Sequence, residues 1–204
     1  MEKGPWSTIW RNPRETIQYL VDTQPRLYFF PLIILGGIAQ TLGNATAIGD
    51  MLPFSALLLA CILSGPLSGL FTVYVGGFVL HRVSQRLGGL APLEHIRTVI
   101  VWSWAPFVYT LPLWGVKYIL FRNELFLIEK PFIDSQPVLS GLFDFMTMVD
   151  FAVFVFYLYI LFTGLSQVNK FSMLKSIGSW VLMSLVLGIP MLLILYLLGP
   201  IVPK

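Results

Sequence analysis

Five polar residues in otherwise apolar surroundings are the strongest candidates for chemistry in this chain. They are two amides, one lysine and two aspartates: Gln40, Asn44, Lys117, Asp144 and Asp150. A charge inside hydrocarbon is costly, so such groups face the interior of a helix bundle or a water-filled pocket and pair with one another. A lysine and an aspartate at similar depth can form a structural ion pair, or they can hold a solute or a proton. Both interpretations stay open at this point.

No second set of residues has the pattern of a catalytic or metal site. The chain has no phosphate-binding glycine loop, no nucleophile elbow and no metal-ligand cluster. We therefore predict a protein that is not an enzyme and uses no cofactor or metal. His81, Glu94 and His95 border one loop, but their spacing matches no standard metal site. The single cysteine, Cys61, is typical of a small apolar core residue.

The elements that must position the polar residues are five apolar stretches. They cover residues 27–47, 54–80, 99–121, 145–165 and 177–198. At a rise of about 1.5 Å per residue, about 20 residues cross a hydrocarbon core of about 30 Å. Charged residues make up 11% of the chain and its mean hydropathy is +0.80, whereas soluble proteins carry about 25% charge. We predict an all-α polytopic membrane protein, a bundle of five transmembrane helices with a short N-terminal interfacial helix.

The chain divides at the start of the first apolar stretch. Residues 1–26 are predicted to be a cytoplasmic segment with an interfacial helix, and residues 27–204 a five-span membrane domain. Asn12, Pro13 and Glu15 have the order of a helix start. Trp6 and Trp10 are of the type that settles at headgroup depth. The first apolar run is too long for a signal peptide, so we expect it to stay in the mature protein. The segment can serve as a membrane anchor or as a partner-binding face.

Small residues in the second apolar stretch predict close helix packing. They are Ser64, Gly65, Ser68, Gly69, Thr72 and Gly76. In lipid, small side chains let two helix backbones approach each other closely. A strict four-residue repeat drifts around a helix, so one neighbour is expected to touch only part of the row. Packing inside the bundle is the first interpretation, and a dimer interface is the alternative.

The distribution of basic residues predicts the orientation. Nine of the 13 lysines and arginines lie in segments on the same side of the membrane as the N-terminus, and basic residues concentrate on the cytoplasmic side. We therefore expect a cytoplasmic N-terminus, and an odd number of spans then puts the C-terminus outside. The basic residues flank the spans and form no stripe, which indicates contact with lipid headgroups and excludes nucleic acid as a partner.

Nearly the whole chain resembles the YIP domain family of Ypt/Rab-interacting membrane proteins, in particular its prokaryotic branch. The resemblance rests on WRNPRETI at residues 10–17, on GG at 88–89 and on WSWAP at 102–106. It implies five spans, a cytoplasmic N-terminus, a prokaryotic inner membrane and no catalytic residues. Eukaryotic relatives act in vesicle traffic, pair with related membrane proteins and bind small GTPases through a longer N-terminal segment. Here that segment has about 26 residues, and QPRL at 24–27 replaces the Asp-Leu-x-Gly-Pro signature, which argues against a GTPase partner.

Two functions from different classes follow. The first is a non-enzymatic component that organises lipids or protein partners in the bilayer, the partner being a second copy or another membrane protein. The alternative is a small transporter or channel with a polar site in the outer half of the bundle. A water-accessible cavity that reaches Asp150 favours transport, whereas a groove toward lipid or a partner favours the organising role.

Overall fold

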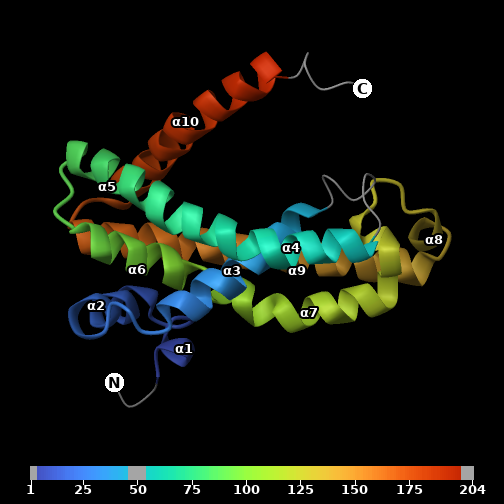
Figure 1. Cartoon of the computed structure of the whole chain (residues 1–204). Coiled ribbons are helices and arrows are strands. Elements are labelled where there is room, and N and C mark those ends of the chain that lie inside the picture. Colours follow the sequence, from blue (N-terminus) through green and yellow to red (C-terminus); the bar gives the residue numbers. More distant parts are fainter. Residues whose placement is uncertain (1–3, 46–53, 199–204) are drawn as a thin grey trace.

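The computed structural model describes residues 4–45 and 54–198, and within these ranges every regular element is a helix (Figure 1). Four helices are long and apolar enough to cross a membrane: Ser55–Arg86, Leu93–Phe126, Pro137–Asn169 and Met173–Leu193. The helix Phe29–Asn44 is apolar but shorter. The predicted all-α, polytopic membrane fold is confirmed. The first apolar helix has 16 residues, about 24 Å of rise, and is shorter than predicted. Residues 46 and 47 of that prediction lie outside the described residues.

The elements follow one another as short N-terminal helices and long apolar ones. Their bounds are α1 (Pro5–Thr8), α2 (Pro13–Thr23), α3 (Phe29–Asn44), α4 (Phe54–Phe71), η3 (Thr72–Gly76), α5 (Gly77–Arg86), α6 (Leu93–Ser103), α7 (Ala105–Phe121), η4 (Arg122–Phe126), α8 (Pro131–Asp134), α9 (Pro137–Asn169) and α10 (Met173–Leu198).

Two of the long helices change character near their middle. Helix α4 continues through Pro66, and the chain then makes the π-helical turn η3 before α5. Between α6 and α7 the helix is interrupted at Trp104, directly before Ala105 and Pro106. Proline lacks a backbone N–H and suits the first turn of a new helix, which explains why the interruption lies there.

The WSWAP residues lie at the centre of the core. Trp102 and Trp104 are fully buried, and Trp104 packs against Gly36 of α3. A Cβ atom on Gly36 would lie 2.7 Å from the Trp104 ring, so only glycine leaves room for the indole there. This contact fixes the start of α7 against α3.

Helices α3 and α4 pack closely through glycines. A Cβ atom on Gly65 would lie 2.7 Å from the Ile38 Cα, and one on Gly69 would lie 2.5 Å from the Ile33 carbonyl oxygen. Both glycines therefore allow backbone contact between the two helices. Other members of the predicted row lie on other faces of the helix, because each residue is rotated by about 100° from the one before it. Ser64 is exposed, which corrects the packing role predicted for it.

The rest of that row leads away from α3. Ser68 and Thr72 are half-buried, and Gly76 is buried, where an added Cβ atom would lie 3.9 Å from both Met183 of α10 and the Thr72 side chain. The row thus serves two different neighbours in succession, α3 through its glycines near the middle of α4 and α10 near the start of α5. This agrees with the expectation that one neighbour touches only part of the row.

The N-terminal segment docks on the bundle. Ile17 and Leu20 of α2 are fully buried against α6 and α9. The Trp6 ring lies 5.4 Å from the Trp102 ring, and Trp10 stacks on Phe156 of α9 at 5.0 Å. The two tryptophans therefore pack against protein aromatics, beyond the headgroup contact that the sequence predicted. The N-terminal segment is part of the folded core.

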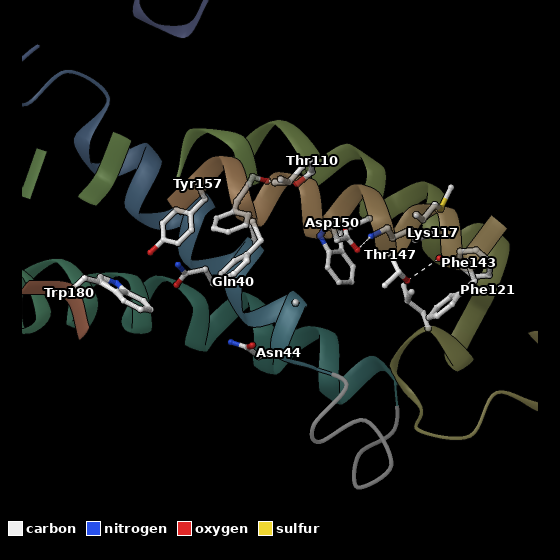
Figure 2. A pocket seen from close by; sticks show the side chains of 18 residues that line it. Gln40, Asn44, Thr110, Lys117, Phe121, Phe143, Thr147, Asp150, Tyr157 and Trp180 are labelled. Carbon is white, nitrogen blue, oxygen red and sulfur yellow. Dashed lines mark hydrogen bonds and ion pairs between the residues drawn. The ribbon is translucent and has the colours of Figure 1, made fainter. Parts of the chain in front are cut away.

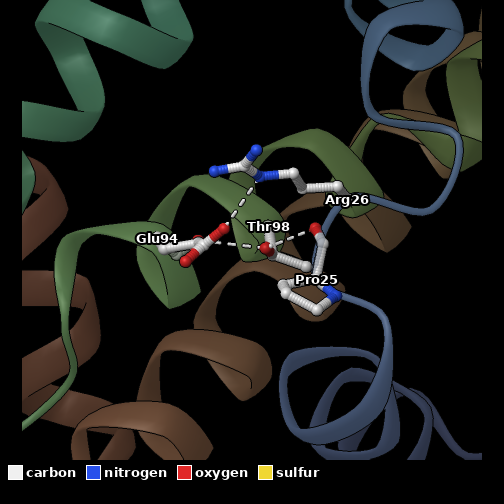
Figure 3. Close-up of polar contacts among 4 residues, drawn as sticks. All are labelled: Pro25, Arg26, Glu94 and Thr98. Carbon is white, nitrogen blue, oxygen red and sulfur yellow. Dashed lines mark hydrogen bonds and ion pairs between the residues drawn. The ribbon is translucent and has the colours of Figure 1, made fainter.

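The turn between α2 and α3 is held on α6 by polar contacts (Figure 3). The Thr98 hydroxyl donates to the Pro25 carbonyl oxygen at 2.9 Å, and Arg26 Nε lies 3.1 Å from a Glu94 carboxylate oxygen. These contacts attach the chain to α6 just before α3 enters the bundle.

Helix α10 leaves the bundle along its length (Figure 1). Its first part contacts α5 and α9, and its later part carries exposed apolar side chains such as Leu185, Ile189 and Leu192. In water this surface would be unfavourable, whereas in a bilayer hydrocarbon covers it. Trp180, in the first part of α10, lines the site described next.

Candidate functional site

A cavity of about 640 Å³ lies between α3, α7, α9 and the beginning of α10 (Figure 2). Its walls carry aromatic and aliphatic side chains together with a few polar ones. Of the described residues of α10, Trp180 alone lines it, so α10 bounds the cavity at one end only. Along the rest of its length the cavity is bounded by α3, α7 and α9.

A shared spacing on α7 and α9 forms two of the walls. Residues separated by three and four positions lie on one face of a helix, as in a coiled-coil seam. The lining residues of α7 follow this spacing: Phe107, Thr110, Trp114, Lys117 and Phe121. Five of the seven lining residues of α9 follow it as well: Phe143, Met146, Asp150, Val153 and Tyr157. The two charged residues of the cavity therefore occupy seam positions on neighbouring helices.

Lys117 and Asp150 form an ion pair across this seam. The Lys117 side chain is 3% exposed, and its ammonium also lies 4.7 Å from the centre of the Trp114 ring. The Asp150 side chain is 42% exposed. The lysine is thus enclosed by protein, while the carboxylate reaches the surface of the cavity. A buried cation needs both the carboxylate and the aromatic face, because burial removes its water.

Gln40 and Asn44 lie on the opposite wall, on α3 (Figure 2). They are four residues apart and therefore share a face of the helix. Gln40 is half-buried and Asn44 is exposed. Within the described ranges neither amide has a hydrogen-bond partner on another side chain or backbone group, so both are available to a ligand.

Asp144 lies elsewhere, which corrects its place in the predicted cluster. It is exposed and does not line the cavity. Six residues separate Asp144 from Asp150 on α9, which turns the two side chains about 120° apart around the helix. The structure therefore brings together Gln40, Asn44, Lys117 and Asp150 and leaves Asp144 out.

Five further lining residues carry polar atoms and were missed by the sequence reasoning. They are Thr110, Trp114, Thr147, Tyr157 and Trp180. Each threonine hydroxyl donates to a carbonyl of its own helix at 2.9 Å, and its oxygen can still accept a hydrogen bond. The signal that could have identified those on α7 and α9 is their position, near or on the three-and-four spacing that also contains the two charges. No such periodic signal marks Trp180.

The cavity offers an ammonium, a carboxylate, amides and hydroxyls at one place and aromatic rings around it. This combination can hold a polar or zwitterionic group and an attached apolar chain. In the part of the chain that the structure describes, no three histidine, cysteine or acidic side chains gather as they would around a metal ion.

A family model described as the Yip1 domain matches residues 6–198 of the chain. The match covers the N-terminal helices, all the long apolar helices and every residue of the cavity. Neither the curated proteins nor the solved structures contain a significant match to the chain.

Proposed function

The chain belongs to the Yip1 domain family, and we propose that it acts without catalysis, as an integral membrane protein that binds a lipid inside its helix bundle. The observation that carries this proposal is the cavity, in which the Lys117–Asp150 pair lies among aromatic walls. Its volume of about 640 Å³ is in the range of ligand sites in proteins, about 300–1,000 Å³.

The distribution of polar and apolar groups favours an amphiphilic ligand. The polar group of a lipid would lie at the ion pair and at the amides of Gln40 and Asn44, which have unused hydrogen-bonding capacity. The hydrocarbon chain would follow the aromatic side chains toward Trp180 of α10, the helix whose later part diverges from the others. A small soluble solute would have no use for that apolar extension.

We also propose the orientation that the charges predict, in a prokaryotic cytoplasmic membrane. The N-terminal segment and the α5–α6 turn lie on the cytoplasmic side, and the C-terminus lies outside. The cavity is then in the outer half of the bundle. The apolar surface of α10 is available to lipid, to a second copy or to another membrane protein.

The test of the lipid site is a variant that fills the cavity without disturbing the fold. Gly43 lines the cavity, and a Cβ atom there meets nothing within 4 Å. Gly43→Phe should therefore fold normally and displace the ligand. Gly115→Phe is the matched control, because Gly115 is equally open but lies outside the cavity.

Native mass spectrometry after gentle detergent extraction measures the lipid that each form retains. We expect the natural protein and Gly115→Phe to keep about one lipid that Gly43→Phe loses. Equal retention by all three forms would contradict a lipid site in this cavity.

Transport is the second candidate, and the partial exposure of Asp150 toward the cavity favours it. Proteoliposomes loaded with a pH-sensitive dye measure proton flux directly. A flux that Asp150→Asn abolishes, without loss of folded protein, would replace lipid binding by transport. No flux above that of empty vesicles would leave the lipid proposal in place.

A further inference from the structure

Three basic side chains that form no ion pair with a described carboxylate lie at the α5–α6 end of the bundle, away from the cavity. Arg82 and His81 belong to α5, and Arg97 belongs to α6. His81 lies close enough to both arginines for their charges to act on it. The Nε of Arg97 and the Nδ1 of His81 are buried and have no hydrogen-bond partner. Buried polar atoms of this kind are usually hydrogen-bonded, so the missing partners need an explanation.

The fold holds the Arg97 side chain in place. Its Cγ lies over Gly77, where an added Cβ would come within 3.3 Å, so the missing side chain makes room for the arginine. Its guanidinium lies 4.5 Å from the centre of the Tyr74 ring. Tyr74 belongs to the π-helical turn η3, and such turns are frequent at functional sites. The guanidinium is thus positioned before any ligand arrives.

The nearest carboxylate on the same helix is engaged elsewhere. Glu94 lies three residues before Arg97 on α6, a spacing at which the two could pair. Its carboxylate is instead paired with Arg26 of the α2–α3 turn (Figure 3). The described ion pairs are Arg26–Glu94 and Lys117–Asp150, so within the described ranges no carboxylate neutralises Arg82 or Arg97.

We propose that Arg97 and Arg82 bind the phosphate of an anionic phospholipid. Arginine binds phosphate through two parallel N–H donors, and an arginine held on a ring loses little freedom when it does so. Basic pockets between helices on the cytoplasmic side are suited to lipid phosphates.

The surface beside the two arginines identifies the phosphate as that of a lipid. Tyr74 is 40% and Phe78 is 45% exposed, and Arg82 lies 5.2 Å from the Phe78 ring. Apolar side chains therefore continue from the cations along the outside of α5 and of α4, where Phe71 is 58% exposed. An acyl chain attached to the bound phosphate can lie along them, whereas free phosphate gains nothing from this surface.

The test compares ligands and variants in detergent solution. The full chain is titrated with phosphatidylglycerol, with phosphatidylcholine and with inorganic phosphate, and native mass spectrometry measures the bound lipid. Arg97→Gln removes one cation of the site. Arg14→Gln is the matched control, because Arg14 is exposed on α2 at the same end of the molecule and loses the same charge.

We expect phosphatidylglycerol to bind more tightly than phosphatidylcholine, and its affinity to fall about tenfold in Arg97→Gln and less than twofold in Arg14→Gln. Equal losses in the two variants would show attraction by net charge alone and overturn the proposal. So would displacement of the lipid by millimolar inorganic phosphate, which would mark a site for the free ion.

A second variant keeps the proposal testable if Arg97→Gln does not fold. Arg82→Gln changes the other helix and is exposed, so it should fold and reduce the affinity for phosphatidylglycerol severalfold. Unchanged binding by Arg82→Gln would then count against the site. The cavity is untouched by these variants, so Gly43→Phe tests the lipid in the cavity separately.

Discussion

The Lys117–Asp150 pair gives a quantitative test of what an intramembrane charge pair does in this bundle. Asp150→Asn keeps the size of the side chain and removes the negative charge, so the ammonium of Lys117 stays buried, 3% exposed, without its carboxylate. Removing one partner of a buried pair costs about 3–5 kcal/mol. Here the cost should be nearer about 2–3 kcal/mol, because Asp150 is 42% exposed and the Trp114 ring still holds the cation.

Thermal unfolding in detergent, followed by tryptophan fluorescence, measures this cost. For a chain of about 200 residues, 1 kcal/mol shifts the Tm by about 2–4 °C, so Asp150→Asn should lower it by about 4–12 °C. Lys117→Met combined with Asp150→Asn should recover at least half of the loss, because no lone charge remains buried. The exposed Asp144 supplies the control, and Asp144→Asn should change the stability by less than about 0.5 kcal/mol.

The result also separates the two roles that the sequence left open. If the Lys117–Asp150 pair is structural, Asp150→Asn must lose stability and the double variant with Lys117→Met must regain part of it. If Asp150→Asn melts at the temperature of the natural protein but no longer retains lipid, the carboxylate serves a ligand and the stability argument is refuted. A double variant less stable than Asp150→Asn would refute it as well, because the isolated charge would then not be the source of the cost.

Two further outcomes follow from the packing and the charges. Gly69→Leu should destabilise the protein by more than about 3 kcal/mol, because even a Cβ atom lies 2.5 Å from the Ile33 carbonyl oxygen, whereas Gly141→Leu, with nothing within 4 Å, should melt normally. Equal melting temperatures would mean that α3 and α4 separate easily. Reporter fusions at Gly89 and at Pro203 should report opposite sides of the membrane, and the same side for both would refute an odd number of crossings.

The long helices could be predicted from the sequence because their cause is local. An apolar run of about 20 residues in a chain with 11% charge is expected in hydrocarbon, where no water can hydrogen-bond to the backbone. Its N–H and C=O groups must therefore bond to one another, and a helix forms. One helix start was equally predictable, and α2 begins at Pro13, directly after Asn12, as the order of Asn12, Pro13 and Glu15 predicts. The length of α3 was not readable, because apolar residues continue on both sides of it.

The site could be predicted in part, for the same kind of reason. The cost of a charge in hydrocarbon points to Lys117 and Asp150 wherever they lie in the fold. The sequence analysis grouped Asp144 with them because of its depth in the membrane. Depth fixes the position of a residue along a helix but not the face on which it lies, and on α9 Asp144 lies on a different face from Asp150. Ser64 failed in the same way on α4, where Gly65, one residue later, faces α3 instead. Counting in steps of three and four from Asp150 would have excluded Asp144, whereas Ser64 lies four residues before Ser68 and this spacing does not exclude it.

The direction of α10 could not be predicted from the sequence, and it bears on whether a lipid or a small solute is the better candidate ligand. In a soluble protein an apolar side chain identifies the buried face of a helix, but in a bilayer lipid and protein neighbours accept the same residues. Leu185 and Ile189 would suit a closed bundle as well as the exposed surface that they form. Had α10 packed along α9 for its full length, protein would cover its apolar side chains after Trp180. Because α10 diverges instead, apolar side chains such as Ile189 stay exposed after Trp180, and this exposed surface supports the proposal of a lipid ligand over that of a small solute.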